Sequence, residues 1–127
     1  MTLSKEKLWK IFEMLPDDLK EAILSEDTAE AIWNICKLCN IEMEKVPEIS
    51  KYVGNVLMGL LPPQKFKDKI QKTLNLDENT AKKLDIYINH YVFDPVRDDL
   101  NELYEEEVKE DNSKESQKPR NVYQEEI

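Results

Sequence analysis

The chain has 127 residues, which is enough for one domain of ordinary size but not for two independent hydrophobic cores. Hydrophobic residues make up 40% of it and charged residues 35%, a balance that excludes a wholly disordered chain. With only two glycines and few β-branched runs, the composition favours helices over strands. The formal net charge of −9 argues against direct binding to nucleic acid or to an anionic membrane surface.

Two absences bear on location. Residues 1–7 are polar and lack the apolar stretch of a secretory signal. The longest apolar run, residues 52–61, is about half as long as the roughly 20 residues that a membrane-spanning helix needs. We therefore expect a cytoplasmic protein with no membrane span.

The first helix is predicted over residues 4–14, with Ser4 as its N-cap and Pro16 ending it. Its apolar residues are spaced three or four apart, which is typical of one buried face. They are Leu8, Ile11, Phe12 and Leu15.

Pro16 opens a second short helix, and a third is expected to start near Thr28 behind Asp27, whose side chain would cap it. Asn40 is the predicted C-terminal cap of that third helix.

The most apolar helix is predicted over residues 46–60, and its second half carries apolar side chains nearly all round. A helix of this kind is usually enclosed by others, so we expect it at the centre of the core. Gly54 and Gly59 weaken helix propensity and would mark places where a neighbouring helix passes close.

The remaining chain predicts a helix after Pro62, another behind the cap Asp77, and a kink or a fresh start at Asp94 and Pro95. The expected fold is all-α: a compact bundle of six or seven short helices around the central apolar helix. We expect residues 1–107 to form this domain and residues 108–127 to be a disordered acidic tail.

Cys36 and Cys39 form a C-x-x-C pair, a spacing found in redox and metal sites. Their place near the end of a predicted helix does not favour the thiolate, and His90 is the only further soft ligand available to zinc. We interpret them as buried core residues, with metal binding or redox chemistry as the alternative.

No motif of a known catalytic site occurs, and with a single histidine the chain has no pair for a histidine relay. We expect no enzyme activity, no catalytic residue, no cofactor and no metal site. The acidic clusters are interpreted as solvated helix faces, although Asp94 and Asp98 are spaced to share a cation. These clusters are Asp17, Asp18 and Glu21, and Asp94, Asp98, Asp99 and Glu102.

Five residues are candidates for partner binding. Trp9 and Trp33 each fall one position off the main apolar stripe, where an aromatic side chain either closes the core or contacts a partner. Val122, Tyr123 and Ile127 return apolar groups to the acidic tail, which is typical of a docking motif or of an inert terminus.

Four segments resemble small helical domains of unknown function in uncharacterised bacterial proteins of reduced genomes. The resemblance covers residues 8–103 and rests on helix stops and core residues. It implies the helical fold but no activity, cofactor or site residue. The segments are residues 15–19, 25–29, 56–63 and 93–96.

These observations predict a non-enzymatic protein-binding module, an adaptor or regulator whose partner is another protein. The alternative is an acidic regulator whose carboxylates mimic nucleic-acid phosphates on an enzyme. The sequence decides neither the identity of the partner nor the oligomeric state.

Overall fold

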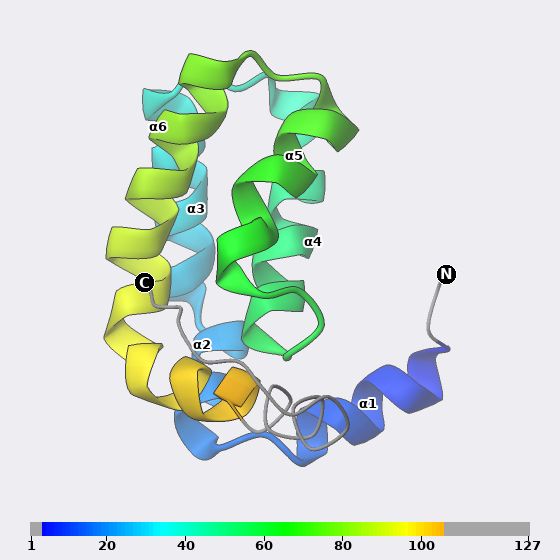
Figure 1. Cartoon of the computed structure of the whole chain (residues 1–127). Coiled ribbons are helices and arrows are strands. Elements are labelled where there is room, and N and C mark those ends of the chain that lie inside the picture. The colour runs from blue at the N-terminus through cyan, green and yellow to red at the C-terminus, as the bar shows by residue number, and fades with distance from the viewer. Residues whose placement is uncertain (1–3, 106–127) are drawn as a thin grey trace, which may run out of the picture.

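The computed structural model describes residues 4–105, and this range is helical with no strand (Figure 1). Its α-helices are α1 (Lys5–Glu13), α2 (Asp17–Leu24), α3 (Glu26–Leu38), α4 (Val46–Leu57), α5 (Phe66–Leu74) and α6 (Glu78–Ile88). Short 3-10 turns are η1 (Met43–Lys45), η2 (Pro63–Lys65) and η4 (Asp94–Val96), and η3 (Asn89–Phe93) is a π-helical turn. Residues 97–105 form a further helical segment.

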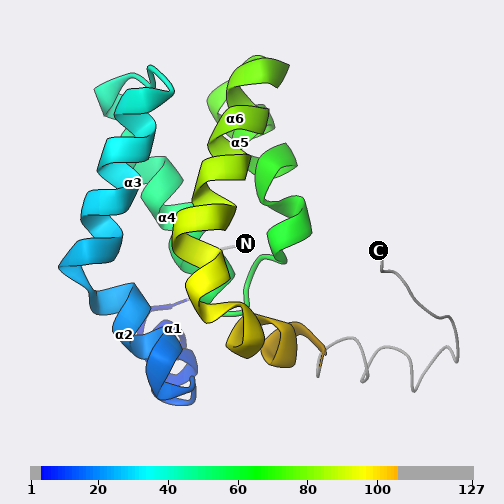
Figure 2. The same cartoon turned by 90° about the vertical axis from the view of Figure 1, so that its left-hand side faces the viewer.

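Four helices stand side by side and make up the body of the molecule: α3, α4, α5 and α6 (Figures 1 and 2). Helix α4 packs against α2, α3 and α5, while α6 packs against α3 and α5. Helices α1 and α2 lie at the foot of this bundle, and α1 extends away from it. The predicted all-α bundle is confirmed.

The predicted central helix is α4, and it supplies five buried residues, more than any other helix within residues 4–105. It ends at Leu57, three residues before the predicted end, because Gly59 has a φ of +85° and turns the chain out of the helix. The buried residues are Ile49, Tyr52, Val53, Val56 and Leu57.

The two glycines behave differently. A side chain at Gly59 would meet the side chain of Leu103, so the predicted close approach is confirmed there. At Gly54 a Cβ would meet nothing within 4 Å, so the same prediction is wrong at that position. Gly54 is therefore not required by packing.

Helix caps follow the sequence with corrections at both ends of α3. Ser4 and Asp77 cap α1 and α6 as predicted. The C-cap of α3 is Cys39, and the predicted C-terminal cap, Asn40, follows it in a left-handed conformation with a φ of +59°. The predicted cap of α3, Asp27, is wrong. Ser25 caps that helix, because its Oγ accepts hydrogen bonds from the backbone N–H groups of Asp27 (3.0 Å) and Thr28 (3.4 Å).

The predicted break at Asp94 and Pro95 takes the form of two irregular turns. The π turn η3 and the 3-10 turn η4 follow α6 without an extended residue between them, and the chain then enters the helical segment 97–105. The predicted tail, residues 108–127, lies outside the described residues.

Candidate functional site

The first candidate surface is formed by the apolar side chains of α1, among which Trp9 is 59% exposed and Met14, directly after the helix, is 85% exposed. The Trp9 ring stacks on the ring of Phe12, with centroids 5.3 Å apart. Helix α1 has no buried residue, although it is amphipathic in sequence. A large aromatic side chain in this position is typical of protein interfaces.

Only Phe12 among the apolar residues of α1 packs against the described core, and it does so from a partly buried position. The ammonium of Lys20, on α2, lies 6.0 Å from the centre of the Phe12 ring. Since α1 adds little to the core, its sequence pattern is not explained by the packing of residues 4–105. We call the side chains of Leu8, Trp9, Ile11, Phe12 and Met14 the α1 face.

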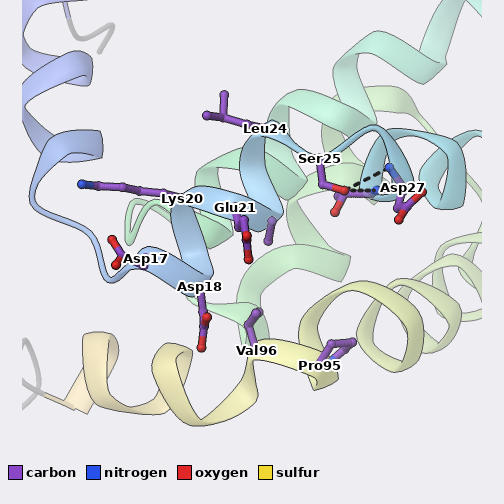
Figure 3. A pocket seen from close by; sticks show the side chains of 11 residues that line it. Asp17, Asp18, Lys20, Glu21, Leu24, Ser25, Asp27, Pro95 and Val96 are labelled. Carbon is purple, nitrogen blue, oxygen red and sulfur yellow. Dashed lines mark hydrogen bonds between the residues drawn. The ribbon is translucent and has the colours of Figure 1, made fainter.

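A second candidate surface is an open groove of about 1130 Å³ between α2, the start of α3 and the turn η4 (Figure 3). Four carboxylates line it, and Lys20 is the one basic side chain among its lining residues. Leu24, which is 71% exposed, adds an apolar group on the α2 side, and Val96 adds another from η4. The carboxylates belong to Asp17, Asp18, Glu21 and Asp27.

The sequence predicts only one wall of this groove. The cluster of Asp17, Asp18 and Glu21 was identified there, but its opposite wall comes from Pro95 and Val96, some seventy residues further along the chain. No local pattern places η4 beside α2, because that contact is set by the path of the chain through the whole bundle.

Trp33 lies on α3 and is 37% exposed, with the ammonium of Lys37 located 5.9 Å from its ring centre. It makes no ring contact with Trp9 within the part of the chain described, so the structure does not bring the two candidate tryptophans together. The other candidates, Val122, Tyr123 and Ile127, lie outside the described residues.

The thiols of Cys36 and Cys39 are free and buried, as the core interpretation predicted. Burial raises the pKa of the Cys36 thiol to about 11, and the nearby Cys39 adds to this effect. Burial also raises the pKa of Cys39, although the charge of Lys83 opposes the change. Both thiols are therefore poor nucleophiles near neutral pH.

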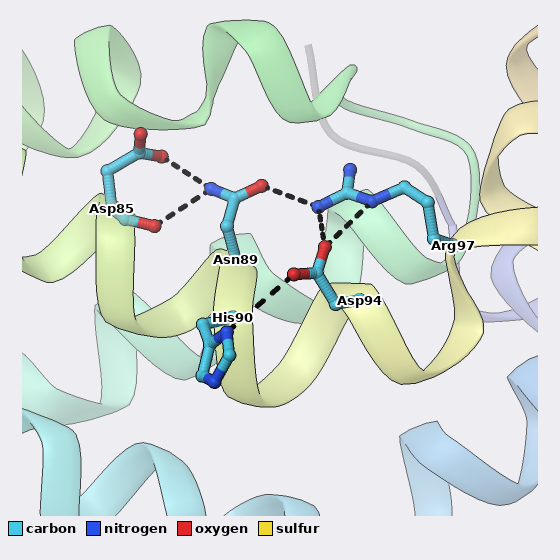
Figure 4. A network of polar contacts seen from close by, with 5 residues as sticks. All are labelled: Asp85, Asn89, His90, Asp94 and Arg97. Atoms are coloured by element: carbon cyan, nitrogen blue, oxygen red, sulfur yellow. Dashed lines mark hydrogen bonds and ion pairs between the residues drawn. The ribbon is translucent and has the colours of Figure 1, made fainter.

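A polar network surrounds the π turn (Figure 4). The Asn89 side-chain amide donates to the backbone oxygen and the Oδ1 of Asp85, at 2.8 and 3.0 Å, and its oxygen accepts from Arg97 at 2.9 Å. Arg97 also donates twice to Asp94 Oδ1. This network ties α6 to the segment 97–105 across the irregular turns and explains the polar residues there without a ligand.

Burial raises the pKa of the Asp85 carboxyl, and the hydrogen bond from Asn89 opposes this effect. Asp94 is already engaged by Arg97, and its second oxygen lies 3.9 Å from His90 Nδ1. Within residues 4–105 no three His, Cys, Asp or Glu side chains are grouped to hold a metal ion. In the same range no helix is long and apolar enough to cross a membrane.

Comparison with known proteins gives no relative: no family model, curated protein or solved structure matches the chain. The two candidate surfaces of the chain are therefore the features from which a function is inferred. Of the two, the α1 face carries the greater apolar exposure, and the groove carries the greater charge.

Proposed function

We propose that the protein is a non-enzymatic binding module, an adaptor or regulator that contacts a partner protein through the α1 face. The observation that carries this proposal is the exposure of Trp9, at 59%, on a helix that buries none of its own residues. Tryptophan is among the residues that most often dominate the binding energy of an interface. Such a residue on a helix that the core hardly uses is explained by a partner.

The test is the double variant Trp9→Ala, Met14→Ala in the full chain, compared with Ile86→Ala as a matched control. Ile86 is also strongly exposed, at 55%, but it lies on α6, outside the α1 face. Removal of an interface tryptophan typically costs about 2 kcal/mol or more, so we expect the affinity of the purified partner to fall by roughly 30-fold or more.

The partner is first captured by photo-crosslinking from residue 9 and then purified for binding measurements. The free energy of unfolding should change by less than about 0.5 kcal/mol, because the substituted side chains are exposed. An unchanged affinity in the Trp9→Ala, Met14→Ala variant would contradict the proposal. So would crosslinking to the same proteins from positions 9 and 86.

The acidic groove supports a second candidate, a regulator whose carboxylates imitate nucleic-acid phosphates on an enzyme. Its four carboxylates and single lysine give the groove a net negative potential. Binding through it should weaken steeply as salt rises, whereas binding through the α1 face should not. The variant Asp17→Asn, Asp18→Asn, Glu21→Gln should abolish that salt dependence, and an unchanged salt dependence would exclude the groove.

A further inference from the structure

The α1 face has a characteristic pattern of charge. On the helical projection Lys5 falls between Phe12 and Trp9, and Lys7 falls beside Ile11. An acidic side chain, Glu13, lies on the far side of Trp9, at the edge of the face. Lys20 reaches the Phe12 ring from α2. None of these three lysines forms an ion pair with another residue in the range 4–105.

This local pattern stands out in a chain whose net charge is −9. An apolar surface that carries ammonium groups with no ion-pair partner in residues 4–105 is complementary to a segment that carries apolar and acidic side chains together. The charge of the α1 face therefore favours a binding segment that is both apolar and acidic.

The chain itself contains a segment of this chemistry. From Glu105 onward it has eight acidic residues against four basic ones, and residues 121–127 combine the apolar Val122, Tyr123 and Ile127 with Glu125 and Glu126. No other stretch after residue 105 combines aromatic, aliphatic and acidic side chains in this way.

The reach is sufficient. The last described residue is Glu105, and the 17 residues that lead from it to Val122 span up to about 55 Å when extended. A folded body of about 100 residues has a radius of gyration of only about 13 Å, so the segment reaches any point of its surface. Tethering at this distance gives an effective concentration of the order of 1 mM, enough to hold a contact of about 0.1 mM affinity closed most of the time.

We propose that residues 121–127 dock on the α1 face of the same chain. Tyr123 and Ile127 contact Trp9 and Phe12, and the carboxylates of Glu125 and Glu126 face the three lysines. This inference rests on the proposed function and extends it: the segment occupies the partner-binding face until a partner displaces it.

The test uses Trp9 as the only tryptophan of the full chain, in a Trp33→Phe background. The variant Tyr123→Ala, Ile127→Ala should shift the Trp9 emission to longer wavelength and raise its quenching by acrylamide about twofold, as expected if most of the face is covered. The matched control is Ser113→Ala, Gln117→Ala in the same tail, which should change neither quantity. A Trp9→Phe chain, with Trp33 as reporter, should not respond to the tail substitutions.

A charge exchange tests the pairing. Lys5→Glu with Lys7→Glu should expose Trp9 as the tail variant does, and adding Glu125→Lys with Glu126→Lys should restore its protection. Equal quenching in all chains would overturn the proposal. Protection that grows with protein concentration would also overturn it, because a second copy of the chain would then be the occupant. These measurements need no partner, so failure here is separate from failure of the proposed function.

Discussion

The side chain of Leu103 lies directly against the backbone of Gly59. A Cβ on Gly59 would lie 3.0 Å from Leu103 Cδ2. The backbone φ of Gly59 is +85°, a conformation that residues other than glycine rarely adopt. Helix α4 therefore ends where the helical segment 97–105 passes over it.

We expect Gly59→Ala to destabilise the protein by roughly 1–3 kcal/mol, because the substitution combines backbone strain with crowding. Gly54→Ala should instead stabilise it by about 0.5–1 kcal/mol, because Gly54 lies inside α4 and a Cβ there meets nothing within 4 Å. Urea unfolding of the two variants measures the difference. Equal effects in the two variants would contradict the account of the α4 terminus.

Tyr104, the residue after Leu103, forms hydrogen bonds with the backbone at the end of α4 and in the turn that follows it. Its hydroxyl accepts from the Leu61 N–H at 3.3 Å and lies 2.6 and 2.7 Å from the carbonyl oxygens of Leu61 and Val56. We expect Tyr104→Phe to lower the free energy of unfolding by about 1–2 kcal/mol, because these part-buried backbone groups lose a partner. Tyr91→Phe, at a tyrosine that is 58% exposed, is the control and should leave the unfolding free energy nearly unchanged.

Helix α3 gives a prediction about capping. Ser25→Ala should cost about 1 kcal/mol, because two backbone N–H groups lose their acceptor. Asp27→Glu keeps the charge in the first turn and should change stability by only a few tenths of a kcal/mol. A larger loss for Asp27→Glu than for Ser25→Ala in urea unfolding would mean that the cap lies at residue 27.

The start of α3 shows how much of a helix end the local sequence can predict. Serine and aspartate are both good caps, they stand two residues apart, and each is followed by helix-forming residues. The sequence thus predicts that a helix begins here but not at which of the two residues. The same holds for the end of α4, where the sequence predicts the helix and the contact between Gly59 and Leu103 decides its last turn.

The glycines and the groove mark what sequence could not predict. Gly54 and Gly59 look alike within one apolar run, and only the distant Leu103 separates their roles. The sequence predicts Trp9 as a candidate because its position beside the apolar stripe of its helix is a local property. The groove needed Val96 beside α2, which depends on the path of the whole chain.

The buried thiol of Cys36 predicts a loss of stability in alkali. Its pKa is raised from 9.0 to about 11 in the folded protein, so the unfolded chain releases this proton first as pH rises. The free energy of unfolding should therefore fall above pH 9 and stop falling through this group near pH 11. The slope is at most about 1.4 kcal/mol per pH unit.

Cys36→Ala provides the comparison. The variant lacks this titration, so the difference in unfolding free energy between the native chain and the variant should shrink as pH rises through that window. The other titratable groups are the same in both proteins, so their contributions largely cancel in the difference. A difference that stays constant between pH 8 and 11 would show that the thiol is not held protonated by burial.

Asp85 makes the corresponding prediction in acid. Burial raises the pKa of this carboxyl above 3.8, so the fold favours its protonated form, and the stability gained from protonation is present below pH 3.8 and lost as pH rises. At pH 7 the charged carboxylate therefore lowers the free energy of unfolding, even though Lys67 and Arg97 attract it. We expect Asp85→Asn to be the more stable protein at pH 7, because an amide oxygen still accepts from Asn89.

The advantage of Asp85→Asn should diminish as pH falls toward 3, where the native carboxyl regains its proton. Urea unfolding at several pH values measures this change, with Asp98→Asn as the control at an exposed carboxylate. If Asp85→Asn were instead less stable at pH 7, the attraction of Arg97 and Lys67 would outweigh burial. The network around the π turn would then hold Asp85 in its ionised form.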